Sequence, residues 1–235
     1  MYNENADESP FNALPPVVVA LAILLAGVEV IFQAGASGLV GGAQGIGWRL
    51  SAVEDYGFSG YIWDQMFAQS YYPLEYMQRF VTYPFVHGNF THAAFAVVIV
   101  LAMGKAVGEV FSALSFISVF VVSSVFGALM YAVLTNDQAP LFGAYPGAYG
   151  LIGAFTFLLW VKLAAVGANS MRAFTLIGVL MGLRLVFGLT AQLLGQHGFG
   201  LDWVAELSGF GAGFLMSFLV SPGGWGRVLA KMRQR

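Results

Sequence analysis

Five ionisable side chains interrupt otherwise apolar stretches of this chain, and they are the first candidates for chemistry. His87 and His92 lie in "RFVTYPFVHGNFTHAAFAVV", Glu206 lies in "LDWVAELSGFGAGFL", and Glu29 and Arg184 stand alone in long apolar runs. Two histidines and one carboxylate are a workable ligand set for a metal ion. However, a spacing of five residues rotates a side chain by about 140° around a helix. The two histidines would then not share a face, and we expect neither a metal nor a cofactor.

Three of these residues also have a structural explanation. Glu29 is expected near the outer interface, where water would solvate it. Arg184 lies near the middle of an apolar run and needs a partner, so we expect a structural ion pair. His87 would cap the entry to the helix that follows. Ionisable groups at membrane depth are expensive, so each remains a functional candidate.

The composition of the chain is that of a membrane protein. Of its 235 residues, 58% are hydrophobic and only 9% are charged, whereas a soluble domain has about 25% charged residues. The net charge of -2 gives no reason to expect nucleic acid, and the absence of Cys excludes disulfides. Six apolar runs are long enough to cross a bilayer as helices, roughly residues 15–33, 90–110, 113–134, 146–161, 173–194 and 203–220. The expected fold class is an all-α polytopic membrane protein with a six-helix bundle and an interfacial helical first loop.

The charges suggest how the chain is oriented and divided. Seven Lys and Arg residues would share one side of the membrane and two the other, if both termini are cytoplasmic. We therefore expect a polar cytoplasmic N-terminus (1–14), a single membrane domain (15–222) and a basic cytoplasmic tail (223–235). The lipid bilayer is the expected surroundings, and a bacterial inner membrane is the expected location.

The segment 34–89 is expected on the outer side, lying in the interface. It contains six of the ten tyrosines together with Trp48 and Trp63, and such aromatic residues favour the membrane–water boundary. The stretch "YIWDQMFAQSYYPLEYMQRFV" predicts one or two short helices there. Two roles remain open for it: a lid that only anchors, or a loop that shapes a lateral entrance.

Small residues form stripes on two of the expected helices. Gly143, Gly147, Gly150 and Ala154 recur at three to four residues in the fourth, and Ala205, Gly209 and Gly213 do so in the sixth. Small residues at this spacing let two membrane helices approach closely. We therefore expect the fourth and sixth helices to touch along these stripes, which would bring Tyr145 towards Glu206.

At this point the chain resembles the rhomboid family of intramembrane serine proteases over nearly its whole length. "WR" lies at Trp48 and Arg49, and "HGNFTH" resembles the His-x4-His that opens the family's second span. "GAYPGAYGLIGA" resembles the family pattern G-A-S-G-A-x-[YF]-G-L-x-G-A of the fourth span. "AELSGFGAGFL" resembles the A-H-x-x-G-F-x-x-G of the sixth.

The departures from the family pattern fall on the chemistry. By this resemblance the nucleophilic serine corresponds to Tyr145, the general-base histidine to Glu206, and the asparagine that helps to form the oxyanion hole to Ala96. His92 remains at its family position, and Tyr149 matches the residue that packs against the base. The resemblance therefore implies a degenerate site, with no intact catalytic residue, in a cavity formed by His87, His92, Tyr145, Tyr149 and Glu206.

Three functions follow from these observations. The leading hypothesis is an inactive rhomboid-like protein that binds transmembrane segments of client membrane proteins. One alternative is an active rhomboid-type protease with a non-standard site, and the other is a small transporter or channel lined by Glu206, Arg184 and Glu29. For the degenerate site we expect a structural lock, in which Glu206 bonds to Tyr145, Tyr149 or His92, because a buried carboxyl needs a hydrogen-bond partner.

Overall fold

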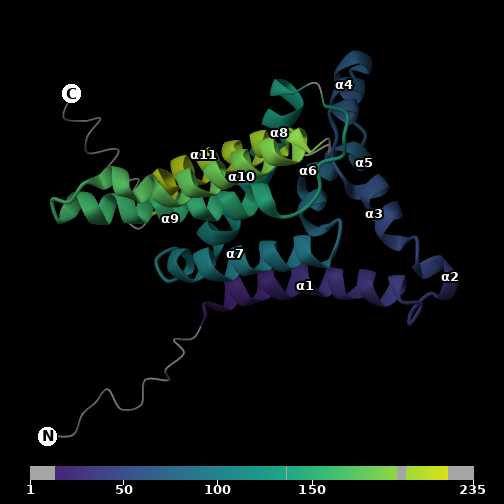
Figure 1. Cartoon of the computed structure of the whole chain (residues 1–235), viewed down its shortest axis with the longest axis horizontal. Helices are drawn as coiled ribbons and strands as arrows, with labels where there is room; N and C mark the ends of the chain where they lie inside the picture. The colour runs from purple at the N-terminus through teal and green to yellow at the C-terminus, as the bar shows by residue number, and fades with distance from the viewer. Residues whose placement is uncertain (1–13, 136, 195–199, 222–235) are drawn as a thin grey trace, which may run out of the picture.

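The computed structural model describes residues 14–135, 137–194 and 200–221, and within them six long apolar helices make up most of the chain (Figure 1). They are α1 (Pro16–Ala36), α7 (Phe90–Gly108), α8 (Ala113–Leu134), α9 (Tyr145–Ala165), α10 (Thr175–Leu193) and α11 (Asp202–Val220). All six are long and apolar enough to cross a membrane. The expected N-terminal segment 1–14, except for residue 14, and the expected tail 223–235 lie outside the described residues.

Local sequence explains where several of these helices begin. Pro16 and Pro146 occupy the first turns of α1 and α9, where a missing N–H costs nothing. The side chain of Asn89 accepts a hydrogen bond from the His92 N–H at 2.9 Å and so caps α7. Ser112 caps α8 in the same way, through the Ser115 N–H.

The segment between α1 and α7 is a string of short helices, as expected for an interfacial loop. It contains α2 (Gly42–Gly45), α3 (Trp48–Tyr56), α4 (Gly60–Gln69), α5 (Leu74–Met77), α6 (Arg79–Thr82) and the 3-10 helix η1 (Tyr83–Phe85). A second 3-10 helix, η2 (Ser170–Phe174), leads into α10. Figure 1 shows α3, α4 and α5 gathered at one end of the long helices.

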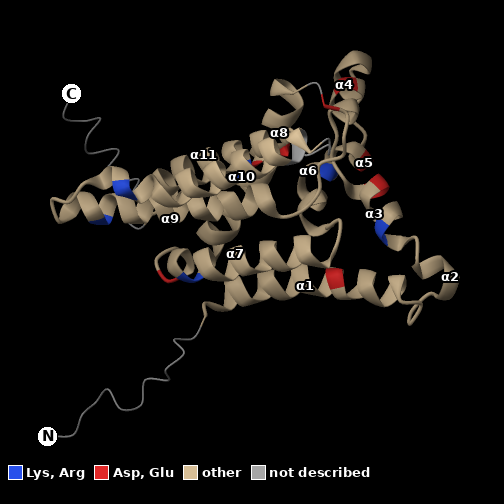
Figure 2. Ribbon diagram, viewed as in Figure 1, with Lys and Arg blue, Asp and Glu red and all other residues tan. Residues whose placement is uncertain are grey.

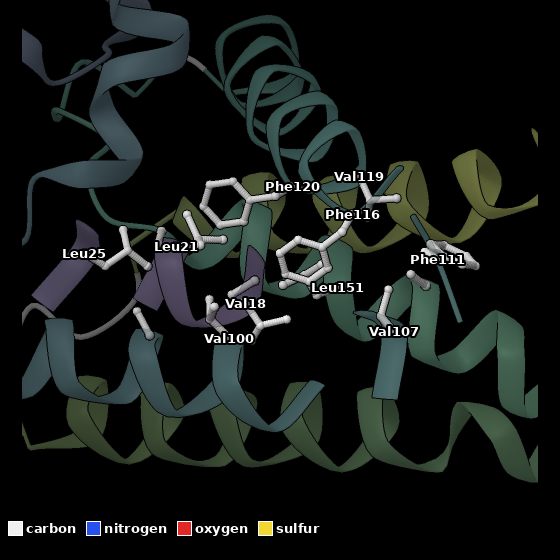
Figure 3. Packing of buried hydrophobic residues seen from close by; sticks show 14 residues of the cluster. Val18, Leu21, Leu25, Val100, Val107, Phe111, Phe116, Val119, Phe120 and Leu151 are labelled. Carbon is white, nitrogen blue, oxygen red and sulfur yellow. The ribbon is translucent and has the colours of Figure 1, made fainter. Parts of the chain in front are cut away.

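The main core joins α1, α7, α8 and α9. Figure 3 shows Val18 and Leu21 of α1 beside Val100 of α7, Phe116 and Phe120 of α8, and Leu151 of α9, all of them buried. In contrast, α11 packs chiefly on α9 and α8. Much of α10 is exposed, because its large apolar side chains Val179, Leu183, Leu185, Val186, Phe187 and Leu189 are about half or more exposed. The helix therefore turns most of its surface towards the surroundings of the bundle.

The charged residues are placed as a membrane protein requires. Figure 2 shows Lys, Arg, Asp and Glu mainly near the two ends of the helices, with a broad uncharged zone between them. We call the end at which α7, α9 and α11 begin the site end, since Phe90, Tyr145 and Asp202 all lie there. Exposed apolar side chains along the helices would otherwise face water, so this chain is an integral membrane protein.

Candidate functional site

The loop that leads into α9 is held by the segment before α7. Gly143 has a positive φ of 99°, which favours glycine, and its N–H donates to the Tyr83 carbonyl at 3.0 Å. The next N–H, that of Ala144, donates to Nε2 of His87 at 3.3 Å. A two-way backbone bridge between Phe58 and Leu141 fixes the same loop on its other side. The start of α9 is thereby fixed to the first loop.

His87 is fully buried and acts as a hydrogen-bond acceptor in this loop. Burial, with His92 as the next contribution, lowers the pKa of His87 to about 4. The ring is therefore neutral at neutral pH, as acceptance from the Ala144 N–H requires. His87 does not cap α7, since Asn89 does so, and it does not line the cavity described below. Its part is to position the loop before Tyr145.

Tyr145 is the first residue of α9, and its ring turns into the site. The ring stacks on His92, with centroids 4.9 Å apart and planes 25° from parallel. Its hydroxyl donates to the backbone carbonyl of His92 at 3.4 Å. Gly88 donates its N–H to Nδ1 of the same histidine at 3.3 Å. Tyr145 and His92 therefore form a stacked pair at the site end.

Glu206 is bound by an arginine from the neighbouring helix. Nη1 of Arg184 donates to both carboxylate oxygens of Glu206, at 2.8 and 2.9 Å, and Nη2 of Arg184 lies 2.6 Å from Asp202. Glu206 is almost fully buried, whereas the Asp202 side chain is 49% exposed. One guanidinium thus ties α10 to two carboxylates on α11, and the ion pair expected for Arg184 is present.

The contacts of Glu206 differ from the expected structural lock, in which its carboxylate bonds to Tyr145, Tyr149 or His92. Tyr149 lies within interacting range of the Glu206 carboxylate, but the hydrogen bonds that hold both oxygens come from Arg184. The Tyr145 hydroxyl bonds to His92 instead. The expected structural lock did not include Arg184, because the spacing of residues within α11 does not show which side chain of another helix reaches Glu206. Asp202 did carry a signal, since it lies four residues before Glu206 on the same face.

These groups line a cavity of about 370 Å³ at the site end. Of the five residues expected there, His92, Tyr145 and Glu206 contribute to its wall, whereas His87 and Tyr149 do not. Tyr149 is buried in a cluster with Ile152, Ile177 and Phe210. Other residues, which were not among those five, also line the cavity, including Tyr131, Asp137, Phe142, Arg184 and Asp202. Within the described ranges, no three His, Asp or Glu residues gather as a metal site would require.

Ala96 lies in the core and not at the cavity. Its side chain is fully buried in the cluster that joins α1, α7, α8 and α9. An alanine methyl group donates no hydrogen bond, so this position has no side-chain donor for an oxyanion.

The glycine stripes serve two interfaces. A Cβ at Gly150 would meet Ser123 of α8, and a Cβ at Gly213 would meet the backbone of Gly150. At Gly209 the added atom would meet the backbone of Pro146. The sixth and fourth spans, α11 and α9, therefore touch at van der Waals distance between backbones.

Two of the glycines expected at this contact lie elsewhere. Gly147 faces Ser124 and Phe120 of α8, and Gly143 precedes α9 and faces the ring of His92. Gly143 lies before the first residue of α9, so helical spacing does not apply to it. Gly147 lies three residues before Gly150, about 60° away around the helix, on the side that faces α8. Gly153, outside the predicted stripe, is the residue that approaches Phe210 of α11.

Glu29 is buried and paired, whereas we expected water to solvate it near the outer interface. Its carboxylate accepts hydrogen bonds from Nη1 and Nη2 of Arg49, at 2.9 and 2.8 Å. Nη1 of Arg49 also donates to the His87 carbonyl at 2.6 Å. The partner is 20 residues away on α3, so the apolar context of Glu29 alone could not show it. The pair joins α1, α3 and the loop before α7.

Comparison with known proteins places this arrangement in a family. No curated protein matches the sequence. The family model described as Rhomboid domain matches residues 74–223, which is more than half of the chain. This range begins at α5 and includes α7 to α11, and with them the loop before α9, the cavity and the glycine contacts. The chain belongs to the rhomboid family.

Proposed function

We propose that this protein binds transmembrane segments of client membrane proteins and does not cleave them. The observation that carries the proposal is the state of Glu206 and Tyr145, which by resemblance stand at the family's base and nucleophile positions. Both oxygens of Glu206 are engaged by Arg184. The Tyr145 hydroxyl is engaged by a backbone carbonyl, which does not act as a base.

The chemistry of acyl transfer explains why this arrangement opposes cleavage. A hydroxyl becomes a nucleophile when a base within hydrogen-bond reach takes its proton. Here the carboxylate is bound to a guanidinium, so taking up a proton would weaken that ion pair. Ala96 supplies no oxyanion donor, and the loss of one such donor costs about 100- to 1000-fold in rate. Together with the Tyr145 hydroxyl, which is bonded to a backbone carbonyl, these are three separate deficits.

Client binding is supported by what the chain retains. It keeps the rhomboid bundle, a cavity at the site end and a peripheral helix, α10, whose apolar side chains are largely exposed. We further propose a bacterial inner membrane with both termini cytoplasmic. Lys105, Lys162 and Arg172 lie at or near the ends of their helices opposite the site end, which supports that orientation. Reporter fusions at each terminus would test it.

A paired assay tests the proposed function. The purified protein, reconstituted in lipid, is incubated with a fluorophosphonate serine probe and with a model transmembrane substrate, beside an active rhomboid protease as positive control. We expect no labelling and no cleavage. Crosslinking in native membranes should recover intact transmembrane proteins. Probe labelling that disappears when a single serine is replaced would overturn the proposal.

A further inference from the structure

A second hollow of the molecule lies between α10 and α11 and is almost purely apolar. Its volume is about 280 Å³, and Met181, Leu185, Trp203 and Leu207 line it together with Arg184. Leu185 is 53% exposed and Leu207 is 41% exposed, so the groove opens to the outside of the bundle. In a membrane protein that outside is the lipid phase.

Arg184 lines both this groove and the polar cavity at the site end. Its side chain, 31% exposed, therefore separates an apolar surface from a charged interior. The apolar groove thus has a charged end.

The charges at that end do not balance. Arg184 is the only Lys or Arg among the described residues that line the cavity, and it faces two carboxylates, Asp202 and Glu206. Asp137 adds a third on the same wall. A cationic group arriving beside Asp202 would offset this excess, and the half-exposed Asp202 carboxylate is open to it.

We infer that the groove between α10 and α11 docks a client transmembrane segment that carries a basic residue in its first turns at the site end. This inference rests on the proposed function and names the class of client. The apolar side of the client helix would lie against Met181, Leu185 and Leu207. Its Lys or Arg would lie beside Asp202, in partial exchange with Arg184.

The position of the acids sets the depth of that basic residue. Asp202 is the first residue of α11, and Glu206 lies four residues further, about 6 Å along the helix axis. A basic residue near the end of a client helix reaches this depth because its long stem lies along apolar surface. The same residue in the middle of a client helix would lie too deep.

Site-specific crosslinking tests the inference. The full chain, with a photoreactive phenylalanine analogue in place of Leu207, is reconstituted in phosphatidylcholine nanodiscs. It receives a Leu/Ala transmembrane peptide with Lys in the third position, or matched peptides with Leu or Glu there or with Lys at the centre. We expect the terminal-Lys peptide to crosslink about tenfold more than the other three. Asp202→Asn should remove the preference, whereas Glu75→Gln, an exposed acid on α5, should preserve it.

The possible outcomes distinguish recognition of a basic residue from client binding in general. Equal crosslinking of the Lys and Leu peptides would overturn the basic-residue inference and leave client binding intact. Failure of every peptide to crosslink at this or any other position would count against the proposed function too. Crosslinks to lipid that peptides do not displace would make the groove a lipid site and overturn the inference. If Asp202→Asn does not fold, the peptide series on the parent protein decides the question alone.

Discussion

The ion pair between Arg184 of α10 and Glu206 of α11 can be tested by removing each charge separately. Replacing Arg184 with Met keeps an apolar stem of similar length but leaves Glu206 buried without its cation. Because removing one partner of a buried pair leaves an uncompensated charge, this change should lower the free energy of unfolding by about 3–5 kcal/mol. The contact with half-exposed Asp202 adds at most about 1 kcal/mol to that figure.

The double variant Arg184→Met/Glu206→Gln separates charge from packing. It removes both members of the buried pair, and replacing a buried ion pair by neutral groups is often close to neutral. We expect the double variant to lie within about 1 kcal/mol of the parent. Arg172→Met, at an exposed arginine before α10, is the matched control and should stay within about 0.5 kcal/mol.

Denaturant titration of the protein in mixed micelles, followed by tryptophan fluorescence, measures all four proteins. Trp203 adjoins the groove next to Arg184 and reports locally on this contact. Equal stability of Arg184→Met and the parent would refute the ion-pair reasoning. If the double variant were as unstable as the single one, the packing of the arginine stem, and not its charge, would hold α10.

Three further changes test other parts of the structure by the same measurement. Gly213→Ala should lower the free energy of unfolding by about 1–3 kcal/mol or more, because the added Cβ meets the backbone of Gly150. Gly211→Ala is the control, since this glycine has open space around it, and it should not change the stability. Equal effects of the two changes would contradict the packing described here. Burial holds the folded pKa of His87 near 4, below its ordinary 6.5, so stability should be full above pH 6.5 and fall by up to about 3 kcal/mol as the pH drops towards 4. A pH profile that His87→Gln leaves unchanged would exclude this residue as the cause. Arg49→Met should destabilise the protein by about 3–5 kcal/mol, since it leaves Glu29 buried and unpaired, and an unchanged midpoint would show that Glu29 is solvated.

The helices could be predicted from the sequence because hydropathy is a local property. The third expected span, residues 113–134, matches α8 (Ala113–Leu134) at both ends. The fourth expected span ends at about residue 161, whereas α9 continues to Ala165, past Lys162. A long side chain at a helix end can extend towards the interface, so one charge near the boundary does not end the helix.

Contacts between helices were predictable only where small residues marked them. Gly150, Gly209 and Gly213 pointed to the contact of α9 with α11, since a bare backbone surface has few other uses in a membrane. The partners of Glu29 and Glu206 were not predictable in this way. Each is an arginine on another helix, and nothing in the periodicity of one helix encodes the rotation of the next.

Arg184 and Glu206 each account for the presence of the other charge, and neither charge can be understood alone. A carboxylate buried at the start of α11 would be costly by itself, and so would a guanidinium on the exposed helix α10. Together they satisfy one another at 2.8 Å. The resemblance of this chain to the rhomboid family places Glu206 at the position of the general-base histidine. The resemblance does not identify the cation that stabilises a carboxylate there. That cation, Arg184, lies on α10, where none of the family motifs quoted above has a residue. The buried pair is therefore a property of two helices, and Arg184, which also binds Asp202, lines the apolar groove between them.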